Sequence, residues 1–466
     1  MFSIKNAYSK LNMQVLKITE KKYFNEIYSA LLSIITIFGW KFNNTLGMIL
    51  MIITAMFILI LTKDLKFVIP NTIYFIFIIS TGFSNNQIPI PIIVLGIGYA
   101  VVLLLFSFKD GFRFNKMRSL YGLLGMAIVN IIPIFWCKMV KPGNEVYYFL
   151  YFGNLGYLLL YIIMVNGIKQ DGIRLVATTM SYLAVILAFE CGFKVWELKD
   201  TVESILQLAY YLGWGLCNEA GIMICVSIPF IFYLLGTEEK IGGMLYQHAK
   251  LLVGVLGLIL TTSRGSYLFG FLEIGILYVV LLFTAKNAKV YQNLFLIFGL
   301  IIITLAFCYK DQVIKVASHI HHLVFTQGLD DNGRKELWIE GYSQWNKNLM
   351  TKIFGAGMVC YLKESTTAVG WMEAPVVFHS TIMETLTAGG ILGFVFLLLH
   401  LYQKYRNLKK CDGLFFITIG VGYIIVDLYG LIDNTYHMYY FMLPMAVIFA
   451  TIDSSITIKD KSNLLF

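Results

Sequence analysis

The sequence predicts an all-α fold: a polytopic integral membrane helical bundle. Of its 466 residues, 58% are hydrophobic and only 14% are charged, against roughly 25% charged residues in soluble domains. Runs close to the ~20 apolar residues that cross a ~30 Å hydrocarbon core recur along the whole chain. Because a soluble fold cannot use this much apolar surface, soluble classes are excluded.

The apolar runs divide into fourteen predicted spans. Several of them are short, and the segment 204–216 is expected to be partial or interfacial, so twelve to fourteen spans are predicted. Their bounds are 27–42, 45–62, 67–83, 88–108, 119–137, 147–168, 174–193, 219–236, 250–262, 267–284, 291–309, 380–401, 413–430 and 436–453.

The distribution of Lys and Arg predicts which loops face the cytoplasm, since short cytoplasmic loops hold the excess of basic residues. With the N-terminus inside, short inside segments hold 23 basic residues and short outside segments hold 6. Both termini are therefore expected inside and the one long loop outside. The net charge of +9 is then largely a topology signal that also favours anionic lipid, and it requires no nucleic-acid partner.

This orientation predicts four regions along the chain. Residues 1–26 form a cytoplasmic N-terminal segment, too long and too mixed to resemble a cleaved signal peptide. Residues 27–309 form an N-terminal membrane bundle, 310–378 an extracytoplasmic loop with amphipathic helices, and 379–466 the C-terminal spans with a short cytoplasmic tail.

No spacing of cysteines or histidines predicts a metal site or a disulfide framework. The seven cysteines are scattered, mostly within apolar runs, and are expected to act as buried thiols. His319, His321 and His322 lie on a predicted amphipathic run at 313–325, but adjacent residues point to different helix faces. We predict no metal and no cofactor.

A polar turn, Leu260-Thr-Thr-Ser-Arg-Gly-Ser266, interrupts an apolar stretch. Placing Arg264 at mid-bilayer would cost roughly 2.5 to 3.5 kcal/mol, so a reversal here is expected to put Arg264 at the outer boundary. Gly265 permits the tight turn, and Ser263 stands beside the arginine. The alternative is an arginine that snorkels from a helix end and binds nothing.

The long loop 310–378 is expected to be functional, because loops of more than about 12 to 15 residues without such a role are uncommon. Trp338, Tyr342, Trp345 and Leu349 follow helical spacing, with Asn332 as a plausible N-cap. Arg334 and Lys335 fall in the first turn, where free N–H groups and two cations suit an anion. A solvated basic face is the alternative.

His379 opens the next span. A helix N-terminus and nearby arginines disfavour imidazolium, so a neutral histidine that accepts a proton is chemically reasonable. A purely structural interfacial histidine is the competing interpretation. Carboxylates near or inside spans are rare and usually functional or paired; of these, Glu219 and Asp433 are the expected site neighbours, while Glu273 is expected to have a polar partner.

Three pieces in this order resemble the O-antigen ligase/polymerase superfamily, which includes the Wzy-type polysaccharide polymerases. They are a Ser-Arg-Gly turn between spans, an Arg heading a Trp-containing loop helix, and a His opening the following span. Asn218-Glu219-Ala-Gly is similar to a short upstream motif of the family, whereas Ser380 stands where many relatives have Asn. The pieces are Thr-Ser263-Arg264-Gly, Gly-Arg334-Lys335-Glu-Leu-Trp338 with Phe-Gly355-Ala-Gly357, and His379-Ser-Thr-Ile-Met-Glu followed by Gly389-Gly-Ile-Leu-Gly393.

The resemblance implies a metal-independent glycosyltransferase in the cytoplasmic membrane of a bacterium. It implies transfer of a glycan from undecaprenyl diphosphate to an acceptor sugar on the outer face. Arg264 and Arg334 would neutralise the diphosphate, and His379 would accept the proton of the attacking hydroxyl. Lys335, Ser263, Asn218, Glu219 and Trp338 would complete the substrate-binding surface.

Within the family, the high span count favours a polymerase of oligosaccharide repeat units, with a ligase as the alternative. The expected partners are the lipid-linked oligosaccharide, membrane lipid and a chain-length regulator. A flippase or other transporter is the competing class, although such a chain is expected to show repeated halves and polar sites at the midplane. A sensor or assembly scaffold is the third interpretation.

Overall fold

The protein was analysed in a computed structural model. It describes residues 12–463 with gaps at 13, 16, 20, 22, 85–89, 110, 138–145, 200–209, 359, 361, 368–369 and 376–377, and between 293 and 333 only Thr304, Lys310, Ile314 and Ser318. Three features predicted from the sequence lie outside the described residues: the histidines at 319, 321 and 322, the Asn332 N-cap, and most of the span at 291–309.

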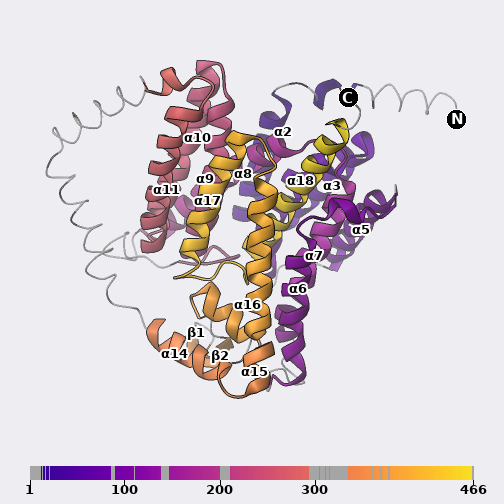
Figure 1. Ribbon diagram of the computed structural model, residues 1–466. Helices are drawn as coiled ribbons and strands as arrows, with labels where there is room; N and C mark the ends of the chain where they lie inside the picture. The colour runs from indigo at the N-terminus through magenta and orange to yellow at the C-terminus, as the bar shows by residue number, and fades with distance from the viewer. Residues whose placement is uncertain are drawn as a thin grey trace.

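The described chain is a helical membrane bundle, which confirms the predicted fold class (Figure 1). Seven of its helices are long and apolar enough to cross a membrane, and five shorter apolar helices accompany them. The seven long ones are α3 (Asn44–Thr62), α8 (Ile173–Leu198), α9 (Cys217–Thr237), α10 (Ile241–Leu260), α11 (Arg264–Thr284), α16 (Thr381–Leu408) and α18 (Tyr439–Asn463). The five shorter ones are η1 with α4 (Leu65–Val68, Ile69–Ser84), α5 (Ile90–Phe108), α6 with η3 (Leu120–Ile131, Ile132–Phe135), α7 (Val146–Gly167) and α17 (Gly413–Tyr429). Helix α2 (Phe24–Lys41), which is in neither group, packs against α3 and α8.

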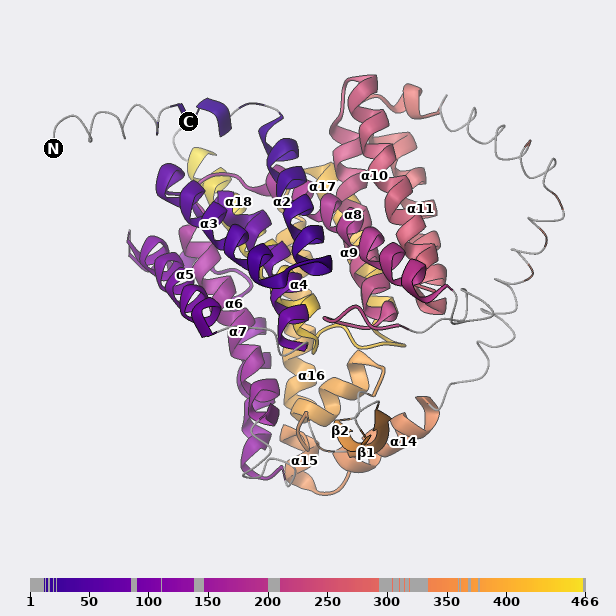
Figure 2. The same ribbon diagram turned by 180° about the vertical axis from the view of Figure 1, so that it is seen from behind.

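The interior of the bundle consists of α8, α9 and α18. The apolar windows of these helices are 83%, 89% and 89% buried, whereas that of α11 is only 28% buried. Helices without polar stripes can be buried on every side, which suits α8, α9 and α18. Helix α11 lies at the periphery of the bundle (Figure 2).

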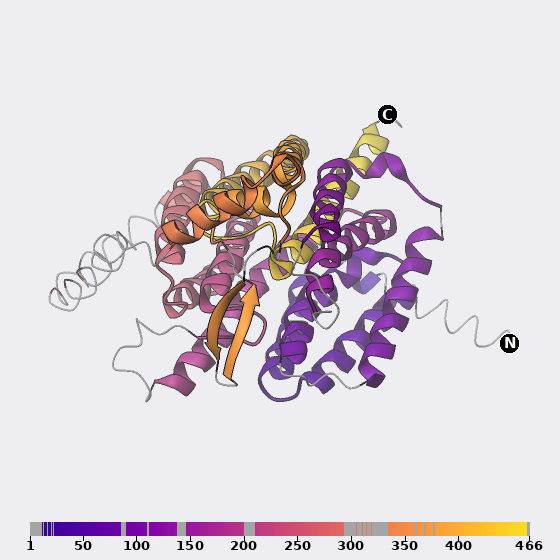
Figure 3. The same cartoon turned by 90° about the horizontal axis from the view of Figure 1, so that it is seen from below.

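The loop that precedes α16 forms a small cap on one end of the bundle. It contains α14 (Arg334–Trp345), α15 (Leu349–Phe354) and an unpredicted antiparallel hairpin of β1 (Leu362–Thr367) and β2 (Gly370–Pro375), in which Leu362 pairs with Pro375. Figure 3 shows the hairpin from this end. Helix α2 begins and α18 ends at the opposite end of the bundle (Figure 1).

Helix α16 bends at Gly390, where φ is +63° and the backbone is not helical. A Cβ atom at this position would lie 2.5 Å from the carbonyl group of Ile353, so the bend needs glycine both for its conformation and for its space. The neighbouring turn is tied to the same place, since the N–H groups of Ala356 and Gly357 donate to the Thr387 carbonyl at 2.7 and 2.9 Å. The Gly355-Ala-Gly357 and Gly389-Gly motifs therefore meet, and they join the cap to α16.

Candidate active site at the start of helix α16

His379 lies in a turn that leads directly into α16. Its φ is +46°, a left-handed conformation that is uncommon for residues other than glycine. Ser380 then caps the helix, because its side chain accepts from the Met383 N–H at 3.5 Å. Serine and asparagine are both good caps, so Ser380 can serve where many relatives carry Asn.

The backbone just before His379 is held on both sides. The Phe378 N–H donates to the Glu384 carboxylate at 3.1 Å, and the Trp338 indole N–H donates to the Phe378 carbonyl at 2.9 Å. Phe378 itself is 1% exposed and packs near Gly341 of α14. These contacts connect the loop helix α14 to the turn that presents the imidazole.

Asp433, in the loop between α17 and α18, contacts the imidazole. Its Oδ1 atom lies 3.3 Å from His379 Nδ1 and also accepts from the Asn434 N–H at 2.8 Å. The histidine side chain is 36% exposed and that of the aspartate 10%. A carboxylate on Nδ1 fixes the tautomer and orientation of the ring, so Nε2 is left to face a ligand.

The same loop, residues 430–437, is fastened to the first turn of α16. The Thr381 N–H donates to the Gly430 carbonyl at 2.7 Å and to the Asp433 carbonyl at 3.1 Å. The Thr381 hydroxyl lies 3.0 Å from that of Thr435. The two segments that supply the imidazole and the carboxylate therefore form one unit.

Glu219 approaches this pair from the first turn of α9. Its carboxylate accepts from the Leu216 N–H and lies near enough to His379 and Asp433 to interact electrostatically with both. Asn218 precedes it and is half-buried. Glu219 and Asp433, the two carboxylates expected beside a site, therefore both lie near His379.

Arg264 is the first residue of α11, after a turn in which Thr262 has φ +54°. Ser263 caps the helix by accepting from the Ser266 N–H at 3.4 Å. The segments 262–264 and 379–381 share one local structure: a residue with positive φ, a serine N-cap and the first residue of a helix. His379 is the positive-φ residue of its segment, and Arg264 is the first helical residue of the other. Arg264 is half-buried.

Tyr429, the last residue of α17, connects the Arg264 turn with the Asp433 loop. Its hydroxyl lies 3.1 Å from Ser263 Oγ and 3.0 Å from Ser266 Oγ, while its carbonyl accepts from the Asp433 N–H at 3.1 Å. A Cβ atom at Gly265 would already lie 2.7 Å from the tyrosine ring. Tyr429 therefore contacts both the Ser263 turn and the 430–437 loop, whose Asp433 contacts the imidazole.

Arg334 lies in the cap, on the helix that contacts the turn of His379. It opens the described part of α14 and lies one helical turn, about 6 Å, from Trp338, whose indole binds the residue before His379. Arg334 is half-buried and makes no ion pair or hydrogen bond within the part of the chain that the structure describes. Lys335 is exposed on the adjoining face of the helix.

The structure therefore brings His379, Asp433 and Glu219 together, and connects Arg264 to them through Tyr429 and Arg334 through Trp338. Tyr429 and Thr381 had no signal in the sequence, because a tyrosine or threonine at a span end is ordinary. Across the described residues, no group of three or more His, Cys, Asp or Glu side chains could hold a metal ion.

Two other intramembrane carboxylates behave differently. The prediction that Glu273 has a polar partner is wrong for the described residues. Its side chain is fully buried, and neither carboxylate oxygen has a hydrogen-bond partner there. Asp427, by contrast, binds Lys404 Nζ at 2.7 and 2.8 Å and accepts from the Tyr405 and Tyr436 hydroxyls at 2.6 Å. Of these two buried carboxylates, Asp427 is paired with a cation and Glu273 has no partner among the described residues.

Comparison with known proteins supports the resemblance. Residues 249–398 match the family model described as O-Antigen ligase (Wzy_C), a segment that contains Arg264, Arg334, Trp338 and His379 but not Asp433. No curated protein matches the chain. The match implies a glycosyl-transferring enzyme of the O-antigen ligase or polymerase kind. Residues 249–398 of this multi-pass membrane protein are thus similar to the O-antigen ligase family, which supports the predicted resemblance to the O-antigen ligase/polymerase superfamily.

Proposed function

We propose that the protein is an oligosaccharide repeat-unit polymerase of the Wzy type. It transfers a growing glycan from undecaprenyl diphosphate to the acceptor sugar of another lipid-linked repeat unit, in the synthesis of capsule, exopolysaccharide or O-antigen. The observation that carries the proposal is the His379–Asp433 contact. Tyr429 links it to the turn that precedes Arg264, and Trp338 links it to the helix that begins at Arg334.

In this reaction His379 acts as the general base. With Nδ1–H donating to the Asp433 carboxylate, Nε2 holds a lone pair that accepts the proton of the acceptor hydroxyl. The oxygen then attacks the anomeric carbon, and the bond from that carbon to the phosphate oxygen breaks. Direct displacement inverts the anomeric centre.

Arg264 and Arg334 stabilise the leaving group. Negative charge grows on the diphosphate as the bond breaks, and guanidinium groups held in place before the reaction lower the energy of that transition state. Each arginine lies in the first turn of a helix, where backbone N–H groups also face an anion. No metal is required in this scheme. Lys335 and Asn218 line the approach to the leaving group, whereas Ser263 is buried and holds the turn that presents Arg264.

A groove beside the site suits the hydrocarbon part of a lipid-linked donor. It lies between α16 and α17, has a volume of about 450 Å³, and extends from Thr381 and Gly430 along Leu397, Leu401 and Leu428. Thr381 and Gly430 are bonded to each other at the base of the His379 turn. A lipid chain in this groove would leave its diphosphate near the imidazole.

The proposal includes a place in the cell. The protein lies in the cytoplasmic membrane of a bacterium with both termini inside, so that the cap of α14, α15 and the β1–β2 hairpin covers the outer face. Residues 27–309 and 379–466 form the membrane bundle on either side of the cap, and a chain-length regulator is the expected protein partner.

The test uses purified protein in lipid nanodiscs with undecaprenyl diphosphate-linked repeat units. A polymerase yields a ladder of product lengths. His379→Ala should lower the rate about 10²- to 10⁴-fold, and Arg264→Ala or Arg334→Ala about 10²- to 10³-fold each. His248→Ala, at a histidine of α10 that binds the Met244 carbonyl, is the matched control and should keep wild-type activity.

The second candidate is an O-antigen ligase, which the description of the matched family favours. A ligase would transfer one block to a different acceptor and produce no ladder. If all three substitutions instead stop repeat units from reaching the outer leaflet, the chain is a transporter. If none changes polymer yield, it is a sensor or scaffold, and the proposed function is wrong.

A further inference from the structure

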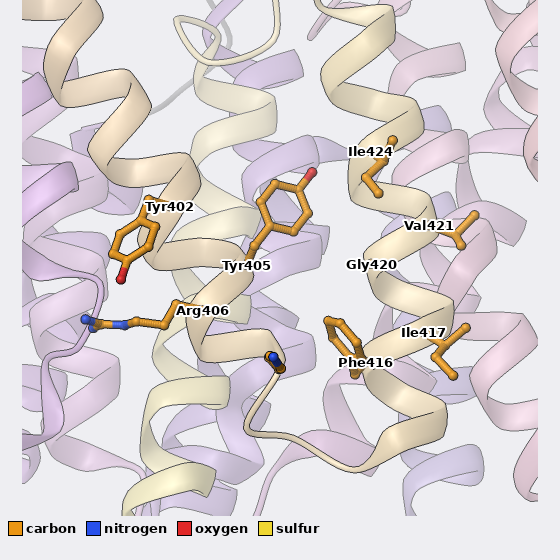
Figure 4. A pocket seen from close by; sticks show the side chains of 9 residues that line it. Tyr402, Tyr405, Arg406, Phe416, Ile417, Gly420, Val421 and Ile424 are labelled. Carbon is orange, nitrogen blue, oxygen red and sulfur yellow. The ribbon is translucent and has the colours of Figure 1, made fainter.

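A second groove lies between α16 and α17, near the end of α16 that is farthest from His379. Its volume is about 670 Å³. Tyr402, Tyr405 and Arg406 of α16 and residues of α17 line it. In Figure 4 the Tyr405 ring lies between the two helices, whereas Tyr402 and Arg406 extend from the side of α16 that faces away from α17. The part of α16 beyond the bend at Gly390 runs from residue 391 to Leu408, and at about 1.5 Å per residue it is roughly 27 Å long. The two ends of α16 therefore lie near opposite boundaries of a ~30 Å hydrocarbon core.

The α17 side of this groove is apolar. Phe416, Ile417, Val421 and Ile424 project from it, with Gly420 bare between them (Figure 4). A Cβ atom at Gly420 would make only ordinary contacts, 3.7 Å from Leu408 and 4.0 Å from Phe416. The missing side chain therefore leaves room for a ligand and is not required by the packing of the two helices.

The α16 side carries a short stripe of aromatic and cationic side chains. Tyr402, Arg406 and Lys409 are four and three residues apart, a spacing that puts neighbouring side chains on one face. The Arg406 guanidinium lies 5.6 Å from the centre of the Tyr402 ring. Arg406 and Lys409 are both exposed, and neither forms an ion pair with any carboxylate of the described residues. Both can therefore turn toward one phosphate group.

We propose that this groove is a binding site for an anionic glycerophospholipid. The phosphate lies between Arg406 and Lys409, and one acyl chain runs over Gly420 along the apolar side of α17. The cations favour an anionic over a neutral headgroup, because basic residues at a membrane surface attract anionic lipid. The apolar wall favours a lipid over a soluble phosphate, which would leave it empty.

This site differs from the groove proposed for the substrate, although Tyr405 and Ile424 border both. Its occupant would bridge α16, which begins beside His379, and α17, which ends beside the loop that carries Asp433. A lipid at this end of the helix pair would therefore support their relative placement at the other end. This inference does not depend on the reaction that the protein catalyses.

The test measures lipid retention by native mass spectrometry of the full-length protein, released from nanodiscs containing equal amounts of phosphatidylglycerol and phosphatidylcholine. Wild type should retain phosphatidylglycerol selectively. At about fivefold in affinity per cation near the surface, the double variant Arg406→Gln and Lys409→Gln should retain it about 25-fold less. Lys410→Gln is the control for charge alone: it removes one positive charge, where the double variant removes two, from an exposed lysine outside the groove, and it should keep the retention of wild type.

A second variant tests the apolar part. Gly420→Leu fills the groove and keeps both cations, so phosphatidylglycerol retention should fall at least fivefold while the thermal unfolding temperature stays within a few degrees of wild type. The proposal is overturned if the double variant retains phosphatidylglycerol as wild type does, if Lys410→Gln loses as much, or if glycerophosphate competes as well as the lipid.

Discussion

The Nδ1 atom of His379 lies 3.3 Å from Oδ1 of Asp433, although 54 residues separate them in the chain. Asp433→Asn keeps the size of the side chain but removes its charge, so the ring loses the partner that fixes its tautomer. Under the proposed function we expect kcat to fall about 10- to 100-fold, part of the 10²- to 10⁴-fold that a general base supplies.

The measurement is initial rate against donor concentration. A residue that acts through the base should lower kcat and leave KM nearly unchanged. Asp412→Asn, which removes a carboxylate from the loop at the far end of α16, is the control. If Asp433→Asn matches wild type while His379→Ala is inactive, the carboxylate has no role in orienting the histidine.

Trp338 and Trp345 allow a paired test of the cap. The Trp338 indole donates to the Phe378 carbonyl at 2.9 Å, and the Trp345 indole donates to the Lys352 carbonyl at 3.0 Å. Either change to Phe removes one hydrogen bond and should cost about 1 kcal/mol of stability. Only Trp338→Phe should also lower glycan transfer, since only this indole reaches the turn of His379. Equal activity in the two variants would contradict the link.

Gly265 and Gly275 provide a matched pair on α11. A Cβ atom at Gly265 would lie 2.7 Å from the Tyr429 ring, whereas one at Gly275 would meet nothing within 4 Å. Gly265→Ala should therefore destabilise the protein by about 1 to 3 kcal/mol through overpacking. Gly275→Ala should be neutral or slightly stabilising, because alanine favours the helix by about 1 kcal/mol. Thermal unfolding in detergent distinguishes these outcomes.

Gly390 and Gly111 separate backbone conformation from crowding. Both have positive φ, +63° and +83°, but only Gly390 has backbone atoms within 2.5 Å of the position of a Cβ atom. Gly111→Ala should cost about 1 to 2 kcal/mol, the penalty for a left-handed residue. Gly390→Ala should cost clearly more and should expose the cap to protease. Similar losses for both would show that the contact of α15 with the bend is loose.

His437 predicts how stability depends on pH. Burial lowers the pKa of its imidazole from 6.5 to about 4, and Nε2 lies 2.9 Å from the Thr385 hydroxyl. Between pH 6.5 and 4 the unfolded chain binds a proton that the folded chain does not. Stability should therefore fall as the pH drops through this window, by about 3 kcal/mol in all at about 1.4 kcal/mol per pKa unit.

The measurement is thermal unfolding of wild type and His437→Gln from pH 7.5 to pH 4. The variant should lose the part of the slope that the imidazole contributes. Identical slopes in the two proteins would show that the imidazole is protonated in the folded state as readily as in the unfolded chain.

The helices were predictable because hydropathy is a property of each segment alone. The predicted span 219–236 corresponds to α9 at Cys217–Thr237. The span predicted at 250–262 was less accurate, since α10 begins at Ile241. Gln247 and Lys250 made the first half of this helix look like a loop, but both bind Glu26, at 2.9 and 3.0 Å, and Lys250 also binds Ser181. Pairing with α2 and α8 offsets the cost of burying them, and a hydropathy window does not contain that pairing.

The site was predictable only as separate pieces. Arg264, Arg334 and His379 stand out because each is a charged or titratable residue at the edge of an apolar run or within the polar loop. The contacts that gather them are made by Tyr429, Trp338 and Thr381, across 163 to 166 residues for the tyrosine and 40 for the tryptophan. Such distant partners leave no periodic pattern, so the Tyr429 bridge and the fastening of the 430–437 loop required the structure.

The fastening of α16 to the 430–437 loop has a consequence for biosynthesis. When α16 enters the membrane, the residues that hold the turn of His379, from Gly430 to Thr435, have not yet joined it, because α17 precedes them in the order of insertion. A ribosome that pauses before α17 is complete therefore leaves an inserted chain whose imidazole lacks its carboxylate and whose helix start lacks its anchors. Catalytic competence should arrive with the final pair of membrane segments, so a chain truncated after Leu408 is expected to be inserted but inert.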